Sequence, residues 1–149
     1  MENTEKGSGG HRDAASEPVR RIPARVPAHV DGVAPLRDVA RAITNTGVGA
    51  VVVDNNLGPL GFVTARDLVE AIADGADPDI CWAGAIMRPV LRMVSREQNP
   101  VAVGEEMAAC ELEVVTVVDE NSRLGVASAL DILRSVVRVV RETQAHHDR

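Results

Sequence analysis

Hydrophobic and polar positions along the chain predict the same series of elements twice: a helix, two strands and a second helix. In the first copy, apolar residues at helical spacing follow Pro35, and the apolar run Ala50–Val53 then indicates a buried strand. In the second copy, Pro100 opens a weaker helical pattern, which is followed by the apolar run Val114–Val118. A unit of about 60 residues buries little apolar surface alone, so the two copies in this 149-residue chain are expected to share a core.

Turn-forming residues follow each buried strand, at positions 54–59 and 119–122. A short strand and a helix then complete each copy; the strands are expected at Leu60–Val63 and Leu124–Ala127, and the helices from Thr64 and Ser128. An extended segment precedes each copy, at residues 21–30 and 88–94.

The spacing between the two copies changes along the repeat. Pro35 and Pro100 lie 65 positions apart, as do Asp54 and Asp119, whereas the glycines of the following strands lie 64 apart. We interpret this difference as one residue deleted from the second turn, where a repeat tolerates a change of length.

The heptad GFVTARD at residues 61–67 returns as GVASALD at residues 125–131. A hydroxyl residue followed three positions later by an acid forms a capping box, in which each side chain accepts a backbone N–H group of the first helical turn. The same atoms suit a nucleotide, because a helix N-terminus attracts phosphate and a nearby carboxylate can accept the hydroxyls of a ribose. On this second interpretation the ribose ligands are Asp67 and Asp131, the phosphate ligands are Thr64 and Ser128, and Gly61 and Gly125 let the ligand approach the backbone.

The two heptads differ at their sixth position. Arg66 can bind phosphate as a charged fork, although an exposed arginine also fits a plain helix surface, whereas Leu130 cannot bind phosphate. Glu111 and Glu113 place negative charge beside the second unit's strand, which disfavours a phosphorylated ligand there. If one cleft takes a nucleotide phosphate, we therefore expect it to be the cleft at the first heptad.

The duplicated unit, with the heptads at its second-helix entries, resembles a tandem pair of CBS domains over about residues 20–140. The resemblance implies an α+β fold in which two βαββα repeats pack about a pseudo-twofold axis and leave two clefts between them. It also implies pairing into homodimers through helices, and adenosyl ligands such as AMP, ADP, ATP or S-adenosylmethionine. The residues that it assigns to the adenine pockets are Val26, Pro27, Met93 and Val94.

The resemblance and the composition together predict five segments. They are a disordered N-terminal tail at 1–19, the first repeat at 20–75, a linker at 76–85, the second repeat at 86–142 and a C-terminal tail at 143–149.

Composition excludes several classes of partner. The net charge of −6 and the presence of only two aromatic residues, Phe62 and Trp82, argue against a nucleic-acid partner. The apolar stretch Val48–Val53 is too short to cross a membrane, and the N-terminus lacks the apolar stretch of a secretory signal, so we expect a cytoplasmic protein without a membrane partner.

The reactive residue types are scattered. Cys81 and Cys110 lack metal-site spacing and are expected to be reduced and largely buried. His29 stands alone, and the other histidines lie in the expected tails, so we expect no metal site, no cofactor and no enzyme activity.

The sequence therefore predicts a regulatory module that binds an adenosyl ligand and changes a partner or its own dimer. The alternative is a dimerising interaction protein that uses the same fold with degenerate nucleotide sites.

Overall fold

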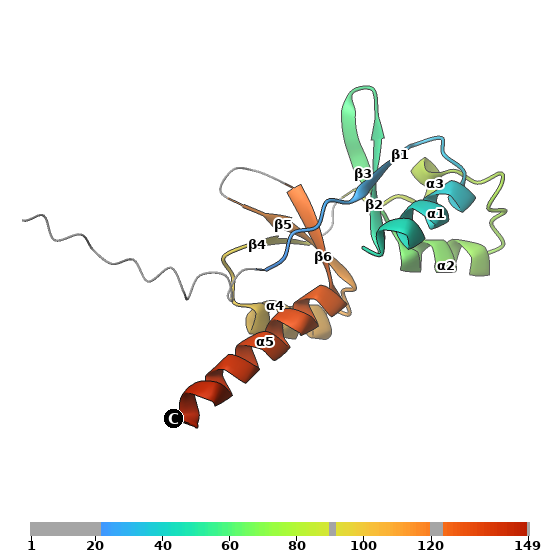
Figure 1. Cartoon of the computed structure of the whole chain (residues 1–149). Helices are drawn as coiled ribbons and strands as arrows, with labels where there is room; N and C mark the ends of the chain where they lie inside the picture. The colour runs from blue at the N-terminus through green and yellow to red at the C-terminus, as the bar shows by residue number, and fades with distance from the viewer. Residues whose placement is uncertain (1–21, 90–91, 120–123, 149) are drawn as a thin grey trace, which may run out of the picture.

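The computed structural model describes residues 22–89, 92–119 and 124–148, and its strands form two three-stranded sheets (Figure 1). In each sheet the first two strands run parallel and the third runs antiparallel to the second. The first sheet contains β1 (Ala28–Asp31), β2 (Ala50–Asn55) and β3 (Gly58–Thr64), and the second contains β4 (Met93–Ser95), β5 (Val114–Val118) and β6 (Leu124–Ser128). The expected N-terminal tail at 1–19 and the turn residues 120–122 lie outside the described residues.

Helices lie beside each sheet and complete two βαββα units, which confirms the expected fold class (Figure 1). The helices are α1 (Leu36–Thr46), α2 (Ala65–Ala73), α3 (Ala83–Ile86), α4 (Pro100–Ala109) and α5 (Ala129–His147). The first sheet with α1 and α2 is called the first lobe, and the second sheet with α4 and α5 the second lobe. Helix α5 continues to His147, so the tail expected from residue 143 is helical instead.

The N-caps of α2 and α5 confirm the helix starts that the sequence predicts, and side chains or glycine cap other helices as well. Thr64 and Ser128 are the N-caps of α2 and α5, and the side chain of Asn99 accepts a backbone N–H group of α4 at 2.9 Å. Gly47 follows α1 with a φ of 64°, a left-handed conformation that glycine adopts without a steric penalty. Local chemistry therefore sets where these helices begin and end.

The cores of the two lobes are related by an offset of 64 positions, which corrects the offset of 65 inferred for the front of the repeat. Equivalent core residues of the two lobes are Val39 and Val103, Ile43 and Met107, Val51 and Val115, and Val53 and Val117. Val53 pairs with Gly61 and Val117 with Gly125, each eight positions further on, so no residue is missing between these strands.

The residues that suggested the longer offset occupy different places in the two lobes. Pro35 immediately precedes α1, whereas Pro100 is the first residue of α4. Asp54 belongs to β2, whereas Asp119 follows the end of β5. Proline is tolerated at either position around a helix start, so it does not fix the alignment.

A segment that precedes the first lobe in sequence packs on the second lobe. In this N-terminal strap, residues 22–25, Ile22 is fully buried in the core of the second lobe. The backbone of Arg25 exchanges two hydrogen bonds with Val126 of β6, at 2.9 and 2.8 Å. The strap therefore carries the chain from the core of the second lobe into the first.

An equivalent segment, the central strap of residues 83–88, packs on the first lobe. Ala83 and Ile86 contact the core of the first lobe, and Arg88 exchanges two backbone hydrogen bonds with Phe62 of β3, each 2.8 Å long. The end of the expected linker at 76–85 and the start of the expected second repeat at residue 86 thus belong physically to the first lobe.

The lobes meet through a small apolar cluster. Its buried members are Val48, Ala50, Val114 and Val126, and Phe62 packs against them. The cluster joins β2 of the first lobe to β5 and β6 of the second, so the repeats share part of their core. Within the described parts of the chain, none of the helices has the length and apolar character needed to span a bilayer.

Candidate functional site

Both heptads form capping boxes at the point where a strand passes into a helix. The hydroxyl of Thr64 accepts the backbone N–H of Asp67 at 3.2 Å, and Oδ2 of Asp67 accepts the backbone N–H of Thr64 at 2.9 Å. Ser128 and Asp131 repeat the pair at 3.2 and 3.0 Å. Each aspartate is only 6% exposed, so its second carboxylate oxygen also needs a partner.

A strap arginine binds that second oxygen in each lobe. Nε of Arg88 donates to Oδ1 of Asp67 at 2.6 Å, and Nη1 of Arg25 donates to Oδ1 of Asp131 at 3.5 Å. The hydrogen bond to Asp67 and the attraction of its charge raise the pKa of the Arg88 guanidinium above its ordinary value. Both carboxylates predicted to hold ribose are thus paired with an arginine that the sequence analysis did not single out.

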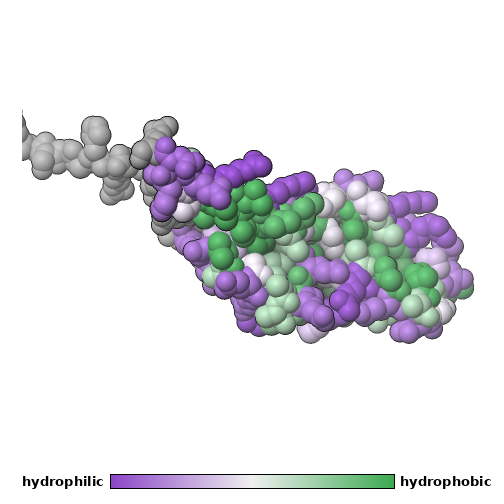
Figure 2. Space-filling view, turned by 90° about the horizontal axis from the view of Figure 1, so that it is seen from below, coloured by the Kyte–Doolittle hydropathy of each residue, from purple (hydrophilic) through white to green (hydrophobic). Residues whose placement is uncertain are grey.

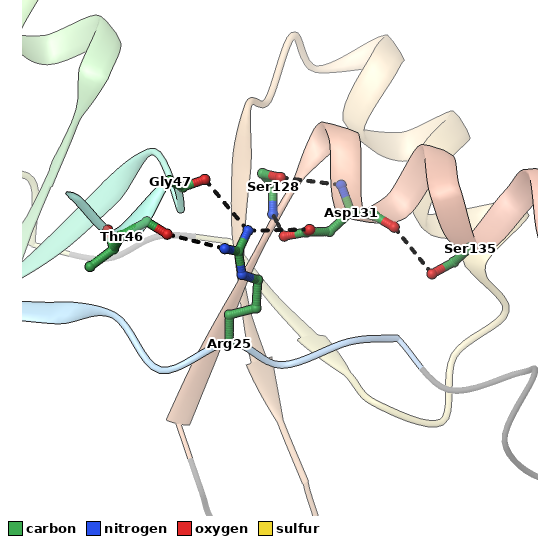
Figure 3. A network of polar contacts seen from close by, with 6 residues as sticks. All are labelled: Arg25, Thr46, Gly47, Ser128, Asp131 and Ser135. Carbon is green, nitrogen blue, oxygen red and sulfur yellow. Dashed lines mark hydrogen bonds and ion pairs between the residues drawn. The ribbon is translucent and has the colours of Figure 1, made fainter. Parts of the chain in front are cut away.

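Arg25 also binds the end of a helix in the other lobe (Figure 3). Its Nη2 donates to the carbonyl of Thr46 at 3.1 Å, and its Nη1 donates to the carbonyl of Gly47 at 3.5 Å. These carbonyls lie at the C-terminus of α1, which attracts a cation. One guanidinium therefore joins the N-terminal strap, the start of α5 and the end of α1.

The motif glycines make room for the straps. A Cβ atom at Gly61 would overlap the carbonyl oxygen of Arg88, and one at Gly125 would lie 2.7 Å from Cβ of Ala24. The close backbone approach expected for a ligand is therefore made by the chain itself. This corrects the role that the sequence analysis gave to these glycines.

A cavity of about 300 Å³ lies at the first heptad, between the lobes. The first lobe contributes Thr64, Arg66, Glu70 and Arg88, and the second contributes residues 110–114. Its volume is at the lower end of the range for small-molecule sites. The structure thus brings the predicted phosphate ligands of the first heptad together with the segment that connects α4 to β5.

Positively and negatively charged side chains both line this cavity. Arg66 pairs with Glu70, whose side chain is four residues later in α2, at 3.1 Å. Nη2 of Arg88 lies 3.8 Å from the other carboxylate oxygen of Glu70. Glu111 and Glu113 also line the cavity, although the sequence analysis assigned their charge to the second unit's cleft. That expectation is wrong because the residues face across to the other lobe.

The residues assigned to the adenine pockets are dispersed. Val94 is part of the second lobe's core and Pro27 is buried, whereas Val26 is 82% and Met93 57% exposed. None of the four lines the cavity at Thr64. Their contact with adenine stays a prediction.

An apolar groove of about 650 Å³ adjoins the second lobe, and the sequence analysis missed it. Helices α4 and α5 supply most of its lining, to which Arg66 of the first lobe and residues 111–113 also contribute. The apolar side chains along it include Val101, Met107, Ile132, Leu133 and Val136. Figure 2 shows hydrophobic side chains reaching the surface between hydrophilic ones on the face seen there.

The reactive side chains differ from expectation in two places. Cys110 is exposed and lines the cavity, whereas it was expected to be buried, and Cys81 is partly exposed. His29 is not isolated, because its Nδ1 lies 2.7 Å from Oδ2 of Asp54. Over the described residues, no three His, Cys, Asp or Glu side chains are grouped so that they could hold a metal ion.

Known proteins share the fold of this chain. Residues 19–74 match the family model of the CBS domain, whereas no curated protein matches the sequence. A CBS-domain containing protein from Agrobacterium tumefaciens is similar at 28% identity and a TM-score of 0.65, over 74% of this chain and 84% of that one.

Two further solved structures contain nucleotides. A CBS domain protein from Pyrobaculum aerophilum complexed with AMP is 27% identical, with a TM-score of 0.61 over 75% of this chain and 88% of that one. The cytosolic domain of the Mg²⁺ channel MgtE in complex with ATP is 25% identical, with a TM-score of 0.51 over 72% of this chain and 44% of that one.

Proposed function

Since residues 19–74 match the family model of the CBS domain and the second lobe repeats the fold of the first, we propose that the protein is a regulatory module that binds an adenosyl ligand at its first heptad. The AMP and ATP in the complexes of two similar proteins support this class of ligand. Binding, rather than catalysis, is the proposed activity.

The observation that carries the proposal is the cavity that Thr64 and Arg66 share with residues 110–114 of the second lobe. A ligand in this place contacts both lobes at once. It therefore favours the arrangement of lobes that fits it best, and a partner that contacts both lobes can sense the change. At the second heptad, the bonds of Arg25 to Asp131 and to the end of α1 occupy the corresponding place.

The charges of the cavity favour a ligand with few phosphates. Glu70, Glu111 and Glu113 line it together with Arg66 and Arg88, and Arg66 is already paired with Glu70. Each added phosphate brings further negative charge toward these carboxylates. Among the adenine nucleotides we therefore expect AMP to bind more tightly than ADP or ATP.

Isothermal titration calorimetry of the full chain with AMP tests the proposal. Asp67→Asn keeps the shape of the ribose ligand but removes its charge, so we expect it to abolish most of the AMP binding, whereas Asp131→Asn retains it. Asp79→Asn is the control, because Asp79 pairs with Arg37 on the surface outside the cavity. Unchanged AMP binding by Asp67→Asn would contradict the assignment of this cleft.

Thermal unfolding gives a second measurement. A ligand at about 100 times its dissociation constant stabilises the folded state by about 2.7 kcal/mol, which raises the melting temperature by several degrees. No shift with adenosine, AMP, ADP, ATP or S-adenosylmethionine would contradict the proposed ligand class.

A second candidate function is a homodimer that needs no ligand, and the apolar groove favours it. Leu133, Val137 and Val140 on α5 are between 41% and 56% exposed and extend the apolar surface of the groove along the helix. A second copy of the chain would cover this surface. Light scattering on the wild type and on Leu133→Gln distinguishes the candidates: a dimer that forms without nucleotide and is lost in the variant supports the second one.

A further inference from the structure

Arg88 occupies the position on Asp67 that a ribose needs. One carboxylate oxygen of Asp67 accepts the backbone N–H of Thr64, and the other accepts Nε of Arg88. Because Asp67 is only 6% exposed, a ribose reaches its carboxylate by displacing one of these donors. The Thr64 bond belongs to the capping box that starts α2, so the arginine is the donor that can leave.

We propose that Arg88 determines the ligand specificity of the first cleft, by holding Asp67 in the empty protein and binding the 5′-phosphate once a ribose has replaced it. This inference rests on the proposed function and adds to it a residue that discriminates between a nucleoside and a nucleotide.

Only the side chain of Arg88 has to move. Its backbone is fixed by the paired hydrogen bonds to Phe62, and Gly61 leaves no space between that backbone and β3. The side chain is 54% exposed and lines the same cavity as Thr64, where the phosphate is expected. A rotation about the side-chain torsions therefore moves the guanidinium from Asp67 toward the phosphate without displacing the central strap.

The exchange is favourable only for a ligand that carries an anion. A neutral ribose replaces a charge-assisted hydrogen bond on Asp67 and leaves the arginine without that partner. A phosphate offers the guanidinium a bidentate partner in return. Arg88 therefore opposes the binding of adenosine and supports the binding of AMP.

The pair at the second heptad has more contacts. Arg25 contacts Asp131 through Nη1 at 3.5 Å, a longer bond than that of Arg88 to Asp67, but it also donates to the carbonyls of Thr46 and Gly47. Leu130 replaces the arginine of the first heptad. A ligand there would have to break three contacts of Arg25, and Leu130 would not offer it the cation that Arg66 supplies at the first heptad. The proposed discrimination between adenosine and AMP is therefore assigned to Arg88 and not to Arg25.

Titration calorimetry with adenosine and with AMP, on the full chain, tests the role of Arg88. In Arg88→Gln we expect the affinity for AMP to fall by about tenfold or more, because a charge-assisted contact is lost, and the affinity for adenosine to rise severalfold. Arg88→Lys keeps a cation and is expected to retain the preference for AMP in weaker form. Arg37→Gln is the matched control, because Arg37 pairs with an aspartate outside the cavity, and both affinities should stay unchanged.

The outcomes separate the two proposals. If the wild-type chain binds neither adenosine nor AMP at millimolar concentration, and ADP, ATP and S-adenosylmethionine do not shift its melting temperature, the proposed function fails and the role of Arg88 fails with it. If one of these other ligands binds instead, only the role of Arg88 fails. If the wild type binds but Arg88→Gln changes both affinities in the same direction, or neither, only the role of Arg88 is overturned. If Arg88→Gln does not fold, Arg88→Lys provides the test. The role of Arg88 is overturned if this variant prefers AMP over adenosine as strongly as the wild type does.

Discussion

Arg25 binds the carboxylate of Asp131, which lies 106 positions further along the chain. The same guanidinium binds the end of α1, so it links the two lobes at a single point (Figure 3). Its pseudo-symmetric counterpart Arg88 stays within one lobe, on Asp67 and beside Glu70. The repeats are therefore similar in backbone but different in how each strap arginine is used.

This relationship predicts that Arg25→Gln lowers the stability of the whole chain. The variant leaves the buried Asp131 with a weaker partner and removes a contact between the lobes. Arg25 is 39% exposed, so solvent reduces the loss, and we expect a decrease in the free energy of unfolding of about 1 kcal/mol. Urea denaturation measures it. Arg37→Gln, which removes a fully surface pair, should stay within about 0.5 kcal/mol of the wild type, and an equal loss in both variants would contradict the link.

The fit of the strap against the motif glycine gives a second prediction. Gly61→Ala places a methyl group against the backbone carbonyl of Arg88, which cannot rotate away as a side chain would. We expect a loss of about 1–3 kcal/mol in the free energy of unfolding.

Gly32→Ala is the matched control for Gly61→Ala. A Cβ atom there would meet its nearest neighbours, side chains of Leu60 and Val53, at 3.8 and 3.9 Å, which is ordinary contact. Its effect should therefore be within about 0.5 kcal/mol. Equal stability of the two alanine variants would show that the central strap does not need the space beside Gly61.

The packing of the N-terminal strap on the second lobe predicts which lobe loses stability when a core side chain of the strap is shortened. Ile22 precedes the first lobe in sequence but is fully buried in the second. Ile22→Ala leaves a cavity that costs about 2–5 kcal/mol, and the loss should weaken amide hydrogen-exchange protection in β5 more than in β2. Val39→Ala, in the core of the first lobe, should give the opposite pattern. If Ile22→Ala weakened amide protection in β2 more than in β5, the assignment of the N-terminal strap to the second lobe would be contradicted.

Sequence reasoning succeeded where the determinants are local. The capping boxes and the strands that precede them each depend on a few neighbouring residues, and both were predicted. The partners of Asp67 and Asp131 were missed because Arg88 and Arg25 come from segments that pack against them only in the folded chain. No periodicity in the sequence indicates which lobe a strap will join.

The alignment of the repeats was wrong for a related reason. Two prolines that each mark a helix start suggested an offset of 65, whereas the buried positions of the two cores follow an offset of 64. The same difficulty put Glu111 and Glu113 in the wrong cleft, because the sequence places these charges just before a strand but does not show which surface they face.

Those two glutamates give the last prediction. They line the cavity at Thr64, and phosphates beyond the first add negative charge to the same space. Glu111→Gln combined with Glu113→Gln should therefore raise the affinity for ATP about threefold relative to the affinity for AMP, as measured by calorimetry. High salt should reduce the difference between the AMP and ATP affinities of the wild type, since the two glutamate side chains are exposed and salt screens their charges. Glu142→Gln on α5 is the control, because its charge lies outside the cavity and should leave the ATP to AMP ratio unchanged. A ratio that the double variant does not alter would mean that charge in this cavity does not select between the nucleotides.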